Sequence, residues 1–242
     1  MIEAGRIQIK RRVAVLGDKV TADTPIFLDG KPLKNMQPRG ELRSRVLVYH
    51  KPTGQLCART EDPTKDSVFH HLPDLAYGRW VMVGRLDVNT SGLLIFTTNG
   101  ELAHRLMHAK FQIQREYAVR ILGELTPQMQ RMLTQGIMLE DGMANFDSLS
   151  LAGGDGANSW VHVTLHEGRN REVRRLFEAV GLTVSRLIRL RFGDVILPRT
   201  LQRGMWLEMS PFAVNKMLRK VDLPAEKHSS NSRLRERRGK ED

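Results

Sequence analysis

The hydrophobic pattern of the chain places one acidic residue between two strands that we expect to be buried. Residues 81–83 and 92–97 are apolar runs of strand length, and a polar loop, residues 84–91, separates them. Asp87 lies at the centre of that loop. A carboxylate between core strands is costly to desolvate unless hydrogen bonds or a cation support it. Asp87 is therefore either a structural anchor or a reactive group.

Apolar and alternating patterns predict further strands. Residues 46–49 form a short apolar run, and residues 184–192 form a longer one. Residues 114–121 alternate strictly, which places Arg115 and Tyr117 on the same face of a strand.

Helices are expected where caps precede apolar positions of helical period. Asn99 and Thr126 are suitable N-cap residues, and a third helix is expected from Arg171. Its apolar stripe is Val173, Leu176, Phe177 and Val180, and its opposite side carries Arg171, Arg174 and Arg175. Strands and helices together predict an α+β fold, with a mixed, mainly antiparallel sheet and flanking helices.

Charge narrows the choice of partner. The 242 residues carry a net charge of +11, and the sequence pI is about 10.2, so a polyanion, either nucleic acid or an anionic membrane surface, is expected. No apolar run approaches the roughly 18 residues of a membrane span, and no signal-peptide pattern is present. RNA or DNA therefore remains as the expected partner, and no membrane partner is expected. Cys57, the single cysteine, excludes an internal disulfide and fits a cytoplasmic setting.

One segment concentrates the positive charge. Residues 168–191 contain seven arginines and two acids. Guanidinium groups match phosphate geometry, so this density favours contacts with an RNA backbone over a merely solvated helix face. His104 and His108 have the spacing of a metal-binding pair, but no third ligand is evident. We expect no metal and no cofactor.

Three motifs then show a family resemblance. GRLDVNTSGLL, which contains Asp87, resembles the signature of pseudouridine synthases, and EGRNREVRRL with LTVSRLIRLRFGDV is similar to late motifs of their RsuA-type ribosomal branch. GELAHRLMH and MLEDG most resemble the subgroup that modifies large-subunit rRNA. The resemblance covers residues 43–222. It implies the pseudouridine synthase fold and conversion of a uridine in ribosomal RNA, of the 23S type or in a large-subunit precursor, to pseudouridine. The enzyme would be a monomer.

The resemblance also implies roles for individual residues. Asp87 matches the catalytic aspartate, Tyr117 the aromatic residue that stacks on the target base, and Arg174 the basic partner of the catalytic carboxylate, although a neighbouring arginine is an alternative partner. Three further substrate-binding positions are the motif arginine Arg85, the loop threonine Thr90 and the apolar Leu187. The expected RNA-binding residues are Arg6, Arg11, Arg12, Arg169, Asn170, Arg171 and Arg175.

The two ends of the chain differ from its centre. Residues 1–42 are basic and β-rich and resemble the second half of an S4 RNA-binding domain, which implies a partial S4-like unit whose start is truncated or misassigned. Residues 223–242 have no apolar period, so we expect a disordered basic tail. The expected organisation is an S4-like unit at 1–42, a catalytic domain at 43–222 and this tail.

Two other functions compete with the synthase. A non-catalytic rRNA-binding assembly factor would be expected to have lost Asp87, Tyr117 or Arg174. A glycoside hydrolase or nucleosidase usually needs a second carboxylate facing the first. The sequence offers no second acid in a convincing position, since Glu101 falls in the next helix.

Overall fold

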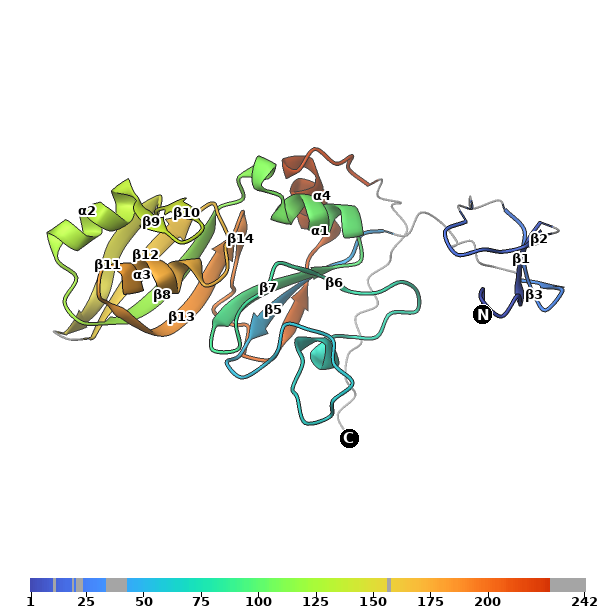
Figure 1. Cartoon of the computed structure of the whole chain (residues 1–242), viewed down its shortest axis with the longest axis horizontal. Helices are drawn as coiled ribbons and strands as arrows, with labels where there is room; N and C mark the ends of the chain where they lie inside the picture. The colour runs from blue at the N-terminus through green and yellow to red at the C-terminus, as the bar shows by residue number, and fades with distance from the viewer. Residues whose placement is uncertain (11, 19, 21–23, 34–42, 156–157, 227–242) are drawn as a thin grey trace, which may run out of the picture. The chain divides into compact units, whose positions relative to one another are not determined.

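The computed structural model describes residues 1–10, 12–18, 20, 24–33, 43–155 and 158–226 (Figure 1). The chain divides into two compact units, Met1–Arg43 and Ser44–Asp242.

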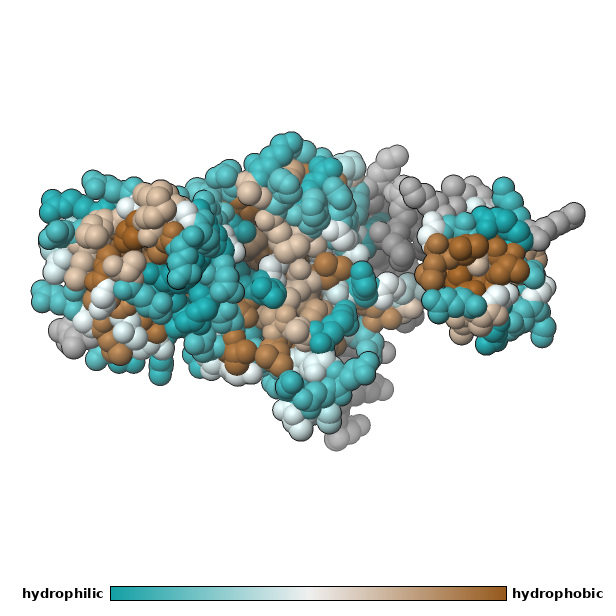
Figure 2. Space-filling view, in the orientation of Figure 1, coloured by the Kyte–Doolittle hydropathy of each residue, from teal (hydrophilic) through white to brown (hydrophobic). Residues whose placement is uncertain are grey.

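The N-terminal unit is a small antiparallel sheet in the order β2-β1-β3-β4. Its strands are β1 (Ile7–Ile9), β2 (Arg12–Val13), β3 (Ile26–Leu28) and β4 (Lys31–Pro32). Ile9 and Ala14 are buried, whereas Val15 and Leu16 are exposed. Figure 2 shows a hydrophobic patch on this unit. The unit therefore buries little apolar surface of its own.

The larger unit is built on a nine-stranded sheet whose continuous order is β11-β12-β8-β13-β7-β5-β15, with β14 paired to β13 and β6 to β7. The strands are β5 (Val46–Lys51), β6 (Val81–Val83), β7 (Ser91–Thr97), β8 (Arg115–Leu122), β11 (Ser148–Asp155), β12 (Asn158–Leu165), β13 (Thr183–Phe192), β14 (Val195–Ile196) and β15 (Trp206–Glu208). A separate hairpin joins β9 (Ile137–Leu139) to β10 (Gly142–Ala144). The pairs are antiparallel except β13 with β7, which confirms the predicted mixed, mainly antiparallel sheet.

Helices cover the sheet at two places (Figure 1). They are α1 (Gly100–Met107), α2 (Pro127–Gln135), α3 (Glu172–Ala179) and α4 (Pro211–Lys220), with short 3-10 turns at Val68–His71 and Ala109–Phe111. Asn99 and Thr126 accept hydrogen bonds from backbone N–H groups of α1 and α2, so both predicted caps are confirmed. Ser210 caps α4 in the same way.

The central strands are buried on both faces. On β7, Leu94 and Phe96 join the core that contains α3, while Leu93 and Ile95 join the core that contains α1 and α4. Successive strand residues point to opposite faces, so a continuous apolar run can fill two cores at once. The loop that precedes β7 is thus fixed to a rigid centre.

The parallel contact between β13 and β7 depends on Gly92. This residue pairs with Arg189, and its φ is +110°. A Cβ at this position would lie 2.3 Å from the Arg189 carbonyl oxygen, so only glycine lets the two backbones approach. The close approach brings the start of β7 beside β13.

Helix α3 differs from its prediction in two respects. Its apolar stripe is buried as predicted, but the helix begins at Glu172, and Arg171 precedes it with a left-handed φ of 49°. Arg174, expected on the polar side, is only 5% exposed. Its guanidinium donates to the carbonyls of Val184 and Asn89, at 3.0 and 3.2 Å, and these bonds replace water.

The beginning of the expected tail is ordered. Leu223 packs partly buried against the core of α1 and α4. The Glu226 carboxylate accepts from the Ser44 backbone N–H at 2.9 Å, and the Glu226 backbone N–H donates to Asn215. Residues 223–226 therefore belong to the larger unit, while residues 227–242 lie outside the described part of the chain.

Candidate active site

A buried lysine fixes the loop that carries Asp87. Lys51, at the end of β5, is 0% exposed, and its ammonium donates to the carbonyls of Asp87 (3.1 Å), Val88 (3.4 Å), Thr90 (2.9 Å) and Pro52 (3.0 Å). Burial lowers the pKa of Lys51, and nearby anionic groups, including Asp87, partly offset this. The Lys51 ammonium therefore holds the backbone of the Asp87 loop in place.

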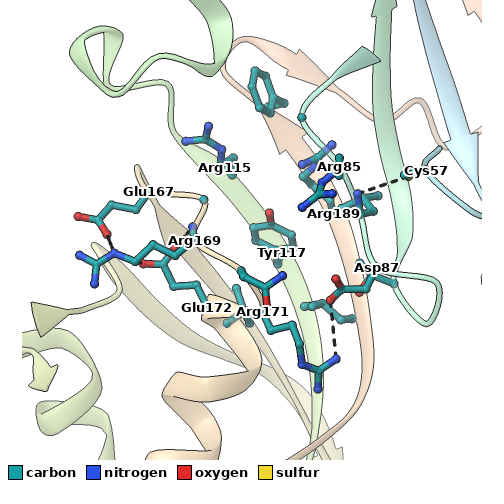
Figure 3. A pocket seen from close by; sticks show the side chains of 18 of the residues that line it. Cys57, Arg85, Asp87, Arg115, Tyr117, Glu167, Arg169, Arg171, Glu172 and Arg189 are labelled. Carbon is teal, nitrogen blue, oxygen red and sulfur yellow. Dashed lines mark hydrogen bonds and ion pairs between the residues drawn. The ribbon is translucent and has the colours of Figure 1, made fainter. Parts of the chain in front are cut away.

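The Asp87 side chain faces a cation from the residue that precedes helix α3. Its carboxylate Oδ2 lies 3.9 Å from Nη1 of Arg171, and the carboxylate remains partly exposed (Figure 3). The sequence predicted Arg174 as this partner and a neighbouring arginine as the alternative. In the structure Arg174 instead holds the backbone of the same loop through the Asn89 carbonyl. Burial and the nearby Arg171 both lower the pKa of Arg174, and Asp87 partly offsets them.

Asp87 lies in the wall of a pocket of about 950 Å³. The pocket also contains the other predicted substrate-binding residues except Arg174. These are Arg85, Thr90, Tyr117 and Leu187. Chain segments far apart in the sequence thus converge on one cavity.

An aromatic ring and aliphatic side chains form one wall. Tyr117 on β8 is 8% exposed, and Leu187 on β13 is 6% exposed. Strands β8 and β13 are antiparallel neighbours, and Tyr117 pairs directly with Arg189. Leu187 lies two residues before Arg189 on β13 and therefore points to the same face. In Figure 3 Tyr117 lies between Arg115 and Asp87.

Two loop residues complete this side. Thr90 is 2% exposed, and its Oγ1 has no hydrogen-bond partner among the described residues. Arg85 is exposed. The Leu86 backbone N–H donates to Cys57 Sγ at 3.5 Å, and burial raises the pKa of that thiol. Cys57 is therefore a neutral, partly buried support of the loop.

Two acids that the sequence interpretation overlooked also border the pocket. Glu167 pairs with Arg169 at 2.6 Å, and Glu172 accepts from the Arg169 backbone N–H at 3.0 Å. Burial, together with the neighbouring Glu167, raises the pKa of Glu172 to about 7, and the hydrogen bond from the Arg169 backbone N–H partly offsets this. The sequence analysis found no second acid in a convincing position facing Asp87, and these two acids enter the same pocket wall from a segment more than 75 residues later in the chain. Both acids, however, are engaged by Arg169.

The arginines expected to contact RNA already have protein partners. Arg175 donates two hydrogen bonds to Asp141, at 2.8 and 2.9 Å, and Arg169 donates to the Met143 carbonyl. Asn170 lies in the pocket wall. In the N-terminal unit, Arg6 pairs with Asp29 and Arg12 with Asp18, while Arg11 lies outside the described residues. In Figure 2 hydrophilic side chains lie over α3, and hydrophobic ones border it on one side.

Three pocket or loop residues were not assigned from the sequence. Arg115 and Arg189 line the pocket, and Lys51 supports its loop. The sequence could have indicated Arg115 and Arg189, because each lies two residues from a predicted site residue on a strand and therefore shares its face. Lys51 had none, since a lysine at a strand end is usually solvated.

No group of three or more metal-ligating side chains occurs in the residues the structure describes. None of the helices described is both long and apolar enough to cross a membrane.

Comparison with known proteins shows the family of the chain. The family model for RNA pseudouridylate synthase matches residues 45–179. The chain is 49% identical to ribosomal large subunit pseudouridine synthase B of Escherichia coli (strain K12) over 240 residues, 98% of this chain and 82% of the relative. Identity to the protein of that name from Vibrio cholerae is 46% over 229 residues, 95% of this chain and 71% of the relative.

A solved structure supports the fold. A crystal structure of pseudouridylate synthase superimposes with a TM-score of 0.64 at 23% identity, covering 89% of this chain and 90% of that one. The predicted fold and the predicted isomerase class are confirmed. The chain belongs to the RNA pseudouridylate synthase family and is a homologue of ribosomal large subunit pseudouridine synthase B.

Proposed function

We propose that this protein converts a specific uridine of large-subunit (23S) ribosomal RNA to pseudouridine, with Asp87 as the catalytic carboxylate. The observation that carries the proposal is that Asp87 projects into a pocket with Tyr117 and Leu187, in a chain half identical to large-subunit rRNA synthases. The net charge of +11 suits an RNA substrate.

The chemistry requires little beyond these groups. The N1–C1′ glycosidic bond breaks, and the uracil rejoins C1′ through C5, so the product is an isomer of the substrate. Asp87 either attacks C1′ or removes a proton from C2′, and both routes need the ionised carboxylate. Arg171 at 3.9 Å supplies a positive charge beside it.

The uridine must leave its stack to reach the pocket. Extrusion from folded RNA costs a few kcal/mol. Stacking on Tyr117 returns ~1–3 kcal/mol of that, and Leu187 supplies an apolar contact. Thr90 and Arg85, in the Asp87 loop, contact the bound nucleotide, and Arg174 keeps that loop in place through the Asn89 carbonyl.

RNA outside the pocket is held by charge. We propose that residues 43–222 form the catalytic domain, with Arg169, Asn170, Arg171 and Arg175 near flanking RNA. The S4-like unit at 1–42 adds affinity through Arg6, Arg11 and Arg12. Because Arg6 and Arg12 each have a carboxylate partner, RNA would have to compete for them. Naked 23S rRNA and a large-subunit precursor are both candidate substrates.

The test maps pseudouridines in large-subunit rRNA from cells that lack this gene. One modified position should disappear, and the wild-type gene should restore it. Asp87→Asn should not restore it but should still bind rRNA. Asp74→Asn, which changes an exposed acid outside the pocket, is the matched control and should restore it. A full modification pattern without the gene would refute the function, and restoration by Asp87→Asn would refute the role of Asp87.

A further inference from the structure

The arginines near the pocket fall into two groups, and one of them has carboxylate partners. The members of this group are Arg169 with Glu167 at 2.6 Å, Arg171 with Asp87 at 3.9 Å, and Arg175 with Asp141 at 2.8 Å. An arginine whose charge is already balanced gains less from a phosphate, because the phosphate must replace an existing partner. These three are therefore not the strongest candidates for phosphate contacts.

The second group is Arg85, Arg115 and Arg189, all in the pocket wall. Within the part of the chain that the structure describes, none of the three has a carboxylate oxygen within the 4.0 Å of an ion pair. In Figure 3 Arg85 and Arg189 lie beside each other, and Tyr117 lies between Arg115 and Asp87. The pocket wall thus carries three arginines without a carboxylate partner in addition to Asp87.

The side chains of Arg189, which is buried, and Arg115, which is half-buried, are both held in place by neighbouring groups. The guanidinium carbons of Arg115 and Arg189 lie 5.0 and 5.4 Å from the centre of the Phe192 ring. Nε of Arg189 donates to the Leu93 carbonyl at 2.8 Å, and Nη1 of Arg115 donates to the Ile113 carbonyl at 2.7 Å. Neutral carbonyls and an aromatic ring orient the two cations but do not neutralise them.

Arg189 also has unused hydrogen-bonding capacity. Its side chain is almost fully buried, at 3% exposure, and its Nη2 has no hydrogen-bond partner among the described residues. A buried donor without an acceptor is unfavourable in the free protein. Burial lowers the pKa of Arg115, and the nearby Arg189 also lowers it, while Tyr117 and Glu172 partly offset this. A bound anion would give Nη2 of Arg189 an acceptor and would stabilise the charged form of Arg115.

We propose that Arg115 and Arg189, with Arg85 from the loop, bind a backbone phosphate of the RNA adjacent to the target uridine. The inference rests on the proposed function, since the pocket must first admit a nucleotide. A phosphodiester supplies one negative charge and two free oxygens, which suits neighbouring guanidinium forks. A uracil carbonyl would accept a hydrogen bond but leave the three charges unbalanced. The nucleotide thus lies with its phosphate at the arginines and its ribose at Asp87.

The experiment compares a charged and a neutral RNA backbone on the full chain. The probes are hexauridylate and its analogue with methylphosphonate linkages, which has no backbone charge. Arg115→Gln and Arg189→Gln should each weaken hexauridylate binding about tenfold or more, as expected for a charged hydrogen bond. Neither should change the affinity for the neutral analogue. Arg120→Gln is the matched control, because it lies on β8 outside the pocket.

The salt dependence gives a second measurement. Each variant should reduce the slope of log affinity against log salt by about 0.7 for one phosphate contact on a single strand. Equal losses with both probes would overturn the proposal, because they would assign the arginines to the base, the ribose or the fold. Unchanged binding of hexauridylate would overturn it as well.

A measurement on the unmutated protein tests the same contact if the variants fail to fold. The Nε–Hε NMR signals of Arg115 and Arg189 should shift on addition of hexauridylate and stay in place with the neutral analogue. Equal shifts, or none, would refute the phosphate contact. Because none of these measurements needs turnover, they remain valid if the protein fails to isomerise uridine. Conversely, if the phosphate contact is refuted, the result of the Asp87 mapping experiment still decides the proposed function.

Discussion

The guanidinium of Arg171 lies 3.9 Å from the carboxylate of Asp87, and its backbone adopts a left-handed φ of 49° just before helix α3. Arg171 lines the pocket, and its guanidinium lies between Asp87 and Glu178 of α3, which is 4.0 Å from its Nη2. Arg174, in the first turn of the helix, donates instead to the carbonyls of Asn89 and Val184. One arginine therefore faces the Asp87 carboxylate, and the other holds the backbone of the loop that carries Asp87.

This division predicts different defects for the two arginines. Arg171→Gln removes a partly exposed ion pair of ~0.2–1 kcal/mol, so turnover should fall about two- to fivefold with little change in stability. Arg174→Gln leaves buried carbonyls without donors and should lower the free energy of unfolding by roughly 1–3 kcal/mol. Single-turnover kinetics and urea unfolding of both variants test this. A large turnover loss in Arg174→Gln without loss of stability would make Arg174 the functional partner of Asp87.

Tyr117 should act through its ring. Tyr117→Phe keeps the stacking surface, so target binding should remain close to that of the wild type. Tyr117→Ala should weaken binding of the target RNA by ~1–3 kcal/mol, the usual cost of one lost base stack. Tyr77→Ala, at a tyrosine that is 70% exposed, is the control. Equal binding by the alanine and phenylalanine variants at position 117 would exclude stacking.

Lys51 should be essential for the geometry of the Asp87 loop. Lys51→Met buries a chain of similar length but leaves the carbonyls of Asp87, Val88 and Thr90 without the ammonium. Leaving buried carbonyls without a donor costs about 1–3 kcal/mol for each group. The free energy of unfolding should fall by this order, and kcat should fall while KM changes little. Lys65→Met, at an exposed surface pair, should change neither. A stable, fully active Lys51→Met variant would contradict this role.

The sequence pattern was sufficient where one local rule decides the outcome. The stripe of Val173, Leu176 and Phe177 is buried as its helical period predicts, and Asn99 caps α1. Strict alternation on β8 likewise placed Tyr117 and Arg115 on one face. These features depend on neighbours a few residues apart in the chain.

The remaining features depend on how distant segments meet. Whether Arg171 or Arg174 faces Asp87 is decided by the residue at which α3 begins and by the parallel pairing of β13 with β7. Glu172 reads as an ordinary first-turn acid, yet packing leaves it 3% exposed in the pocket wall. Lys51 is buried because the Asp87 loop folds over it. Periodicity carries no information on such long-range contacts.

Glu172 should make the stability of the protein depend on pH in an unusual direction. Burial raises its pKa from 4.5 to about 7, so between these values the folded protein holds a proton that the unfolded chain has released. Stability from this group is therefore present at low pH and is lost as pH rises toward 7 and above. The shift corresponds to roughly 3 kcal/mol at 1.36 kcal/mol per pKa unit.

Glu172→Gln should remove this dependence, because the amide oxygen still accepts from the Arg169 backbone N–H but carries no charge to desolvate. Relative to the wild type, the variant should gain up to roughly 3 kcal/mol of stability between pH 4.5 and pH 8. Urea unfolding of both proteins across that range measures the difference, with Glu178→Gln on the exposed side of α3 as the control. A constant difference between Glu172→Gln and the wild type would mean that Glu172 is ionised throughout, with Arg169 offsetting its burial. If Glu172→Gln were instead more stable than the wild type only at low pH, the folded state would favour the charged form of Glu172. That result would be the opposite of the expected pH dependence.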